Sequence, residues 1–328
     1  MTVSSMSSPA KRRRAACLFA YLLLFLMSAN RLLAQQDKSR LQQLQARIQS
    51  EKEVLEAADP THVSTRLTAY RWAILGTDYA NAAEFFEAEK AYTQALQLLR
   101  NDSPAQGLYA GVLEKLGYLY LVYGRFPEAL SCRRAALAVR QQLGVPLEIA
   151  RSQSRLAEVE LMLRKYKQAE AGVERAYQSM LKLEDPEKTD LVSVLVILAY
   201  ARCAQHRCEE GIADARQAVA ISNDGFQPGS LPMGAALAAL GSAELKSREA
   251  AEAGETTRRA VDIFSVQFAP GDPRLTHAMS QYRDCLIAQH KKREAQEVDE
   301  QIAAIDRQEK QHCANCAVSV YGLGLLAR

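Results

Sequence analysis

The 328-residue chain is 48% hydrophobic and 24% charged, which excludes an intrinsically disordered protein, and its ten Pro and sixteen Gly are too few for a collagen-like one. Its formal net charge is +3, but residues 1–34 hold five Lys or Arg and no acid, so the rest carries 36 basic and 38 acidic side chains. A chain this close to neutrality lacks the positive field of a nucleic-acid-binding protein, and its length predicts two domains or an array of repeats.

Residues 1–34 have the pattern of a secretory signal. Four consecutive basic residues at 11–14 precede an apolar run over 15–29. Cleavage is expected after Ala34 or after Ala29, while an uncleaved anchor over residues 15–34 in an inner membrane is the alternative. The apolar run is short for a membrane span, which needs about twenty residues. In either case we expect the rest of the chain to be exported and to be periplasmic, secreted or bound to the cell envelope.

Residues 35–60 contain one amphipathic helix over 37–57. Leu41, Leu44, Ile48 and Leu55 lie near heptad spacing along it. Such a helix packs as a cap on the helices that follow, or it pairs with a second chain as a coiled coil. Because three heptads are few for a coiled coil, the cap is favoured.

Residues 61–308 repeat one helical pattern six times. Each repeat has a Leu or Tyr anchor, and most repeats carry Gly or Ala one, thirteen and twenty residues later. The anchors are Leu75, Leu116, Leu156, Leu198, Leu240 and Tyr282, spaced 41, 40, 42, 42 and 42 residues apart. The residues that fit the pattern best are Trp72, Leu75, Gly76, Tyr79, Ala88, Tyr92, Ala95, Leu116, Gly117, Ala129, Ala136, Leu240 and Gly241.

The pattern predicts two helices per repeat. Small residues at paired places allow the two helices to approach closely, and one such pair cannot bury its apolar faces without its neighbours. Four prolines that follow a capping residue are expected to mark helix starts, at Asp59-Pro60, Ser103-Pro104, Asp185-Pro186 and Asp272-Pro273. The residues therefore predict an all-α fold, an α-solenoid of about six repeats.

The first repeat resembles the tetratricopeptide repeat (TPR) consensus, in Trp72, Leu75, Gly76, Tyr79 and the small residues behind them. The spacing near 42 is closer to the longer kinesin-light-chain-like subtype than to the 34-residue form. The resemblance implies a right-handed superhelix whose first helices line a concave groove that binds a protein or peptide. It also implies a protein that is not an enzyme and that needs no cofactor.

If first helices line the groove, its residues can be predicted by their distance from each anchor. Residues two and five places after an anchor are expected there, namely Tyr118, Leu121, Glu158, Leu161, Tyr200 and Leu245. Packing between adjacent repeats is the alternative for Tyr118 and Tyr200. The Lys and Asn that chaperone-binding members use to hold a C-terminal carboxylate are missing from the matching places, so a chaperone-tail receptor is not expected.

Catalytic patterns are missing from the sequence, but the cysteines leave several chemistries open. The sequence contains no Gly-rich phosphate loop, nucleophile elbow or H-E-x-x-H motif. Cys203 and Cys208 flank a turn, where they either approach each other or leave Cys208 packed in the core. In the tail over 309–328, Cys313 and Cys316 allow a disulfide, a tether to another chain, a metal site or a redox pair.

Two functions of different classes follow. The first is an exported, non-catalytic TPR scaffold that binds a protein or peptide in its groove. It is not expected to bind nucleic acid, and it would contact a membrane only through an uncleaved N-terminal segment. The second is a thiol-active or metal-binding envelope protein whose chemistry lies at Cys313 and Cys316, with the repeats as a platform.

Overall fold

The structure, a computed structural model, describes residues 39, 42–57, 64–82, 84–268 and 271–312. Every regular element within these residues is helical, as the repeat pattern predicts. The chain divides into two compact units, the first ending at Ala91 and the second beginning at Tyr92, so the boundary falls inside helix α3 (Phe85–Leu99). No helix of the described part is both long and apolar enough to cross a membrane. The expected signal over 1–34 and the cysteines of the tail lie outside the described residues.

The first unit contains a helix over residues 42–57 and helix α2 (Thr65–Asn81). Ile48 is buried, and Arg47 Nε donates to Oδ2 of the fully buried Asp78 at 2.7 Å. A second ion pair joins Arg71 Nη1 to Glu51 Oε2 at 3.2 Å. These contacts pack the N-terminal helix on α2, and its role as a cap stays a prediction.

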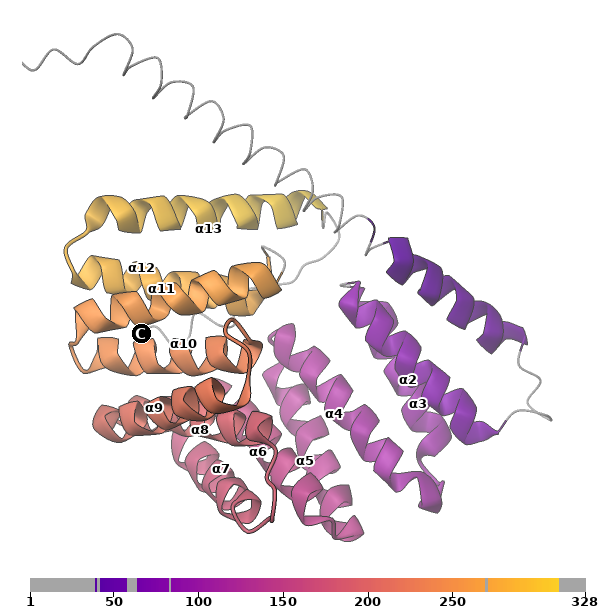
Figure 1. Ribbon diagram of the computed structural model, residues 1–328. Coiled ribbons are helices and arrows are strands. Elements are labelled where there is room, and N and C mark those ends of the chain that lie inside the picture. The colour runs from indigo at the N-terminus through magenta and orange to yellow at the C-terminus, as the bar shows by residue number, and fades with distance from the viewer. Residues whose placement is uncertain (1–38, 40–41, 58–63, 83, 269–270, 313–328) are drawn as a thin grey trace, which may run out of the picture. The chain divides into compact units, whose positions relative to one another are not determined.

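The second unit is a series of consecutive antiparallel helix pairs (Figure 1). After a short 3₁₀ turn η1 (Ser103–Ala105), its helices are α4 (Gln106–Val122), α5 (Phe126–Leu143), α6 (Pro146–Met162), α7 (Tyr166–Met180), α8 (Lys188–Ala204), α9 (Cys208–Gly225), α10 (Leu231–Lys246), α11 (Ala250–Gln267), α12 (Pro273–Ala288) and α13 (Lys292–His312). The five anchors from Leu116 to Tyr282 each lie on the first helix of a pair. The predicted solenoid is therefore confirmed.

Small residues set the distance between the helices of a pair, as the repeat pattern predicts. Ala129, Ala169 and Ala253, each thirteen residues after an anchor, are fully buried. A Cβ atom added at Gly211 would lie 2.8 Å from the carbonyl oxygen of Ala199 on the partner helix. Larger side chains at these places would force the two helices apart.

The turn inside each pair confirms the repeat register independently. The residue eight places after each anchor in the second unit has a positive φ, between 58° and 71°. These residues are Gly124, Arg164, His206, Arg248 and His290. A left-handed residue at one fixed place in five repeats means that all five turns share one geometry, although glycine occupies that place only at residue 124.

The predicted helix start is correct at Pro273. At Pro104 a 3₁₀ turn begins instead of an α-helix, and at Pro186 the prediction is wrong. Asp272 Oδ1 accepts the backbone N–H of Arg274 at 2.9 Å and caps α12. Ser103-Pro104 opens the 3₁₀ turn before α4 instead of α4 itself. Asp185-Pro186 lies in the connection before α8, which starts at Lys188 because its first turn closes on the carbonyl of Glu187. The fourth pair, Asp59-Pro60, lies outside the described residues.

Candidate functional site: the inner surface of the second unit

First helices form the inner layer of the second unit. Among its described helices, α4 contacts α6, α6 contacts α8, α8 contacts α10 and α10 contacts α12. The second helices of neighbouring pairs make no comparable contacts with one another. A stack whose first helices lie closer together than its second helices must curve with the first helices on the inside. The unit therefore presents its first helices on a concave surface, as the resemblance implies.

The predicted groove residues differ in how much surface they present. Tyr118 on α4 is 44% exposed, and Glu158 on α6 is half-buried. Leu121 and Leu245 are also half-buried. These four residues keep surface that a partner can contact.

The other two predicted residues pack inward. Leu161 is 2% exposed and belongs to the apolar core that α6 shares with α7 and α8, so its prediction as a groove residue is wrong. Tyr200 is half-buried against apolar side chains of α8 to α10, and burial raises the pKa of its hydroxyl while a hydrogen bond with Gln281 opposes that shift. Its packing matches the alternative of a tyrosine held between repeats.

A buried polar contact joins α4 to α6 beneath this surface. Glu114 on α4 is 8% exposed and accepts hydrogen bonds from Ser152 Oγ at 2.5 Å and from Arg155 Nη1 at 2.6 Å. Arg140 Nε lies 3.8 Å from the same carboxylate. The hydrogen bonds from Ser152 and Arg155 link two neighbouring first helices through the Glu114 carboxylate, and Arg155 neutralises its charge.

Arg133 on α5 reaches the same junction from the outer layer. It is 3% exposed, and a Cβ atom added at Gly117 on α4 would lie 3.3 Å from its Cδ and Nε atoms. Burial lowers the pKa of the Arg133 guanidinium, the charge of Arg155 lowers it further, and the charges of Glu158 and Glu114 raise it. A side chain larger than glycine at 117 would therefore displace Arg133.

Arg274 lies in the first turn of α12, and its positive charge acts on residues of this junction. Its Nε and Nη2 donate to the two carboxylate oxygens of Asp272 at 2.9 and 2.7 Å, and its guanidinium lies 3.7 Å from the ring centre of Phe268. Burial raises the pKa of the Tyr118 hydroxyl, and the Arg274 charge opposes that shift. The first and last helix pairs of the unit are thus close enough for their charges to interact.

The positive charges of three arginines act on Glu158. Burial raises the pKa of its carboxyl, and the positive charges of Arg133, Arg155 and Arg274 oppose that shift. We call these three residues the arginine cluster. The charges of Arg274 and Arg133 also act on the hydroxyl of the exposed Tyr118.

The repeat pattern did not identify Arg133 as a site residue. It lies seventeen residues after Leu116, the place that Tyr92 occupies after Leu75 in the first repeat. The sequence therefore contains a signal for Arg133, because it places a charged residue where the first repeat has a core tyrosine.

The structure decides between the two alternatives for Cys203 and Cys208. Cys203 at the end of α8 and Cys208 at the start of α9 form a disulfide, with Cα atoms 4.1 Å apart, so Cys208 is not merely a packed core residue. Within the described residues Cys285 is a buried free thiol, and no group of three potential metal ligands occurs. Cys313 and Cys316 lie outside the described residues.

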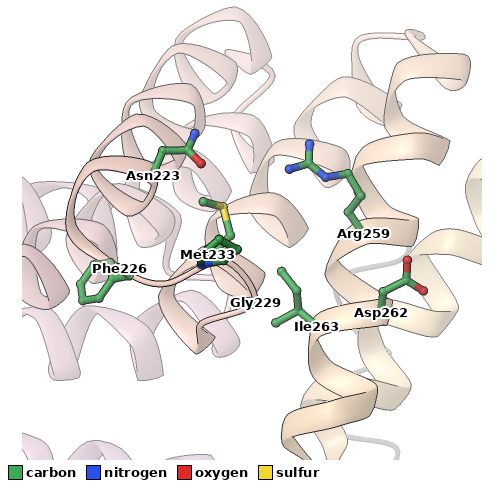
Figure 2. A pocket seen from close by; sticks show the side chains of 8 residues that line it. Asn223, Phe226, Gly229, Met233, Arg259, Asp262 and Ile263 are labelled. Carbon is green, nitrogen blue, oxygen red and sulfur yellow. The ribbon is translucent and has the colours of Figure 1, made fainter.

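A separate hollow of about 330 Å³ lies between α9, the connection after it, and helices α10 and α11. Figure 2 shows Phe226, Met233 and Ile263 around it, with Arg259 and Asp262 on the α11 side. None of the predicted groove residues and none of the arginine cluster lines it. The hollow is therefore distinct from the inner surface.

No family model matches the sequence, and no curated protein matches it. Among solved structures, BtubC (BKLC) from P. vanneervenii is 21% identical over 68% of this chain and 92% of its own, with a TM-score of 0.56. A Rap protein complexed with Competence and Sporulation Factor is 14% identical over 88% and 83%, with a TM-score of 0.55. Aspartyl phosphate phosphatase F from Bacillus subtilis is 14% identical over 88% and 77%, with a TM-score of 0.51. At such identities the likeness concerns the fold alone: the chain has the fold of a TPR-like α-solenoid.

Proposed function

We propose that the chain is a non-catalytic scaffold that binds a protein or peptide on the inner surface of its second unit. The observation that carries this proposal is the exposed Tyr118 beside the arginine cluster, on a concave surface lined by first helices. Tyrosine and arginine are the residues that most often dominate the binding energy of an interface. A neighbour in fold, the Rap protein complexed with Competence and Sporulation Factor, gives the proposal further support.

We also propose that the protein is exported. The basic and apolar pattern of residues 1–34 motivates this location. The Cys203–Cys208 disulfide supports it, because such bonds persist in oxidising compartments and are rare in the cytosol. N-terminal sequencing tests it: a mature protein that begins near Gln35 is expected, and one that begins at Met1 or Thr2 would contradict cleavage.

Site-specific photo-cross-linking tests the binding surface. A benzophenone amino acid is placed at Tyr118 on the inner layer, and as a control at Val266, an 83% exposed apolar residue on the second helix α11. We expect a defined partner to be cross-linked from position 118 and little or none from position 266. Equal cross-linking from both positions, or cross-linking from 266 alone, would contradict an inner binding surface.

A further inference from the structure

A second hollow, of about 300 Å³, lies between α5, α6 and α7. Helix α6 lines it with Gln153, Leu156 and Glu160, which are three and four places apart and therefore share one face of the helix. Arg155 and Glu158, which belong to the inner surface, lie on the opposite face of α6. The hollow is therefore on the side of the second helices and away from the inner surface.

Glu160 brings an unpaired carboxylate to this hollow. The residue is 8% exposed, and its carboxylate forms neither a hydrogen bond nor an ion pair with the described residues. Burial raises the pKa of this carboxyl, whereas the charges of Arg134, Lys165 and Arg175 oppose that shift and favour the ionised form. A buried charge costs free energy unless hydrogen-bond donors replace its lost hydration. Because Glu160 lines the hollow, a molecule bound there can supply those donors.

Helix α7 brings a positive charge to the same hollow. Its lining residues Gln168, Ala171, Gly172 and Arg175 also follow the spacing of one helical face. Arg175 is exposed, and its guanidinium forms no ion pair within the described part of the chain. One hollow is thus lined by an unpaired carboxylate, that of Glu160, and by an unpaired guanidinium.

The rest of the lining suits a small organic molecule. Leu137, Leu156 and Ala171 supply apolar surface, and Gln153 and Gln168 supply amide groups. A volume of about 300 Å³ is at the small end of the range for ligand pockets and is large enough for one amino acid. A metal ion would need several more ligands, and no group of three potential metal ligands occurs among the described residues.

The charges around the hollow determine which charges a ligand needs. A simple cation would satisfy Glu160 but would be repelled by Arg134, Lys165 and Arg175. A simple anion would satisfy Arg175 but would be repelled by Glu160 and would leave it without a donor. A molecule with both an ammonium and a carboxylate group satisfies both side chains.

We propose that this hollow binds a free α-amino acid with an apolar side chain. The ammonium group of the ligand donates to the Glu160 carboxylate, the carboxylate of the ligand accepts from the Arg175 guanidinium, and its side chain packs on Leu137 and Leu156. The site is independent of the proposed scaffold function, to which it adds a small-molecule ligand.

The experiment is isothermal titration calorimetry of the full chain with L-leucine, L-methionine and L-phenylalanine. The amino acid that binds most tightly is compared with its N-acetyl derivative, which lacks the ammonium group, and with its amide, which lacks the carboxylate. The test variants are Glu160→Gln and Arg175→Gln. The matched controls, Glu244→Gln and Arg259→Gln, change the residues at the same repeat places two repeats later, which do not line this hollow.

We expect at least one of the three amino acids to bind at one site per chain and to raise the melting temperature. Its affinity should fall about tenfold or more in Glu160→Gln and in Arg175→Gln, and it should be unchanged in both controls. The N-acetyl derivative and the amide should each bind about tenfold or more weakly. Without ligand, Glu160→Gln should melt at the same or a higher temperature, because the variant removes a buried, unpaired charge.

Several outcomes would overturn this proposal. The first is no measurable binding of any of the three amino acids, and the second is binding that survives both Glu160→Gln and Arg175→Gln. Equal affinity for the amide or for the N-acetyl derivative would contradict a site for both charged groups. A marked fall in the melting temperature of Glu160→Gln with unchanged amino-acid affinity would show that the carboxylate is structural. Cross-linking from position 118 tests the inner surface separately, so failure here would leave the proposed function standing.

Discussion

Two neighbouring parts of the second unit bury very different side chains. Around α7 and α8 the core is apolar, with Val173, Leu195 and Leu198 almost fully excluded from solvent. At the junction of α4, α5 and α6 the buried residues include the charged Glu114 and Arg133. Apolar burial stabilises a fold, whereas a buried charge costs free energy unless it is fully paired. The contrast shows that the α7–α8 core contributes more apolar burial to the solenoid, and it motivates the proposal that the α4–α6 junction lies at a binding surface.

Leu198→Ala sharpens this contrast most strongly. The side chain is 1% exposed in the apolar core, so its truncation should lower the free energy of unfolding by about 2–5 kcal/mol. In a solenoid each repeat contacts only its neighbours, so hydrogen exchange should accelerate mainly in α6 to α10. Leu143→Ala, at a 44% exposed leucine, is the control with little expected effect. Uniform acceleration of exchange across the whole second unit would instead indicate one cooperative body.

Gly211→Ala should have the next largest effect. The added Cβ atom would lie 2.8 Å from the backbone carbonyl of Ala199, so α8 and α9 must separate, at a cost of about 1–3 kcal/mol. Gly107→Ala is the matched control, since its nearest neighbour is the end of the Arg140 side chain at 3.9 Å. Alanine at that helical position should raise stability by about 0.5–1 kcal/mol. Two variants with the same effect in urea unfolding would disprove the role of close helix approach.

Glu244→Gln tests the cost of a buried carboxylate in the mostly apolar α10. Glu244 is 4% exposed, its Oε2 makes no hydrogen bond in the described structure, and burial raises the pKa of its carboxyl. The folded state therefore holds the proton more tightly than the unfolded state does. Wild-type stability should fall as the pH rises from the unfolded-state pKa, about 4.3, through the raised folded-state pKa.

The Gln variant lacks this titration. Above neutral pH it should be more stable than the wild type by about 1–2 kcal/mol, and near pH 4 the difference should vanish. Thermal melting of both proteins across this range measures the effect, with Glu209→Gln at an exposed glutamate as the control. A difference that does not change with pH would rule out the titration of Glu244 as its cause.

Arg248→Gly should give the smallest effect. Arg248 has a φ of 68°, in the left-handed region where a Cβ atom costs about 1 kcal/mol. Glycine occupies the equivalent place in the first repeat of the second unit, at Gly124. Glycine at 248 should therefore raise the melting temperature slightly, and Gly124→Ala should lower it. If both changes lowered the melting temperature, the left-handed turn geometry would not explain a preference for glycine at this place.

Much of the fold could be predicted from the sequence, because it depends on residues that recur. Anchors such as Leu116 and small residues such as Ala129 repeat at a fixed distance, and each pair of helices imposes the same spacing on them. The start of α8 was predicted wrongly at Asp185-Pro186 because a proline fixes its own backbone angle but does not force a helix to begin.

The site could be predicted only in part, because it depends on residues that depart from the repeat. Tyr118 was identified by its distance from an anchor, but the same rule placed Leu161 in the groove although α7 and α8 close over it. Arg133 breaks the pattern at a core place, and a comparison of recurring residues passes over such exceptions. The spacing of Cys203 and Cys208 across a turn left two alternatives, and the structure shows that they form a disulfide.

The most direct test of a recognition surface over the arginine cluster measures binding and stability together in Tyr118→Ala. Tyr118 is 44% exposed, so its loss should leave the helical circular dichroism and the melting temperature nearly unchanged. We expect the affinity for the partner that is cross-linked from position 118 to fall about 30-fold, equivalent to about 2 kcal/mol. A large fall in melting temperature with unchanged affinity would contradict the account and would make Tyr118 part of the packing between repeats.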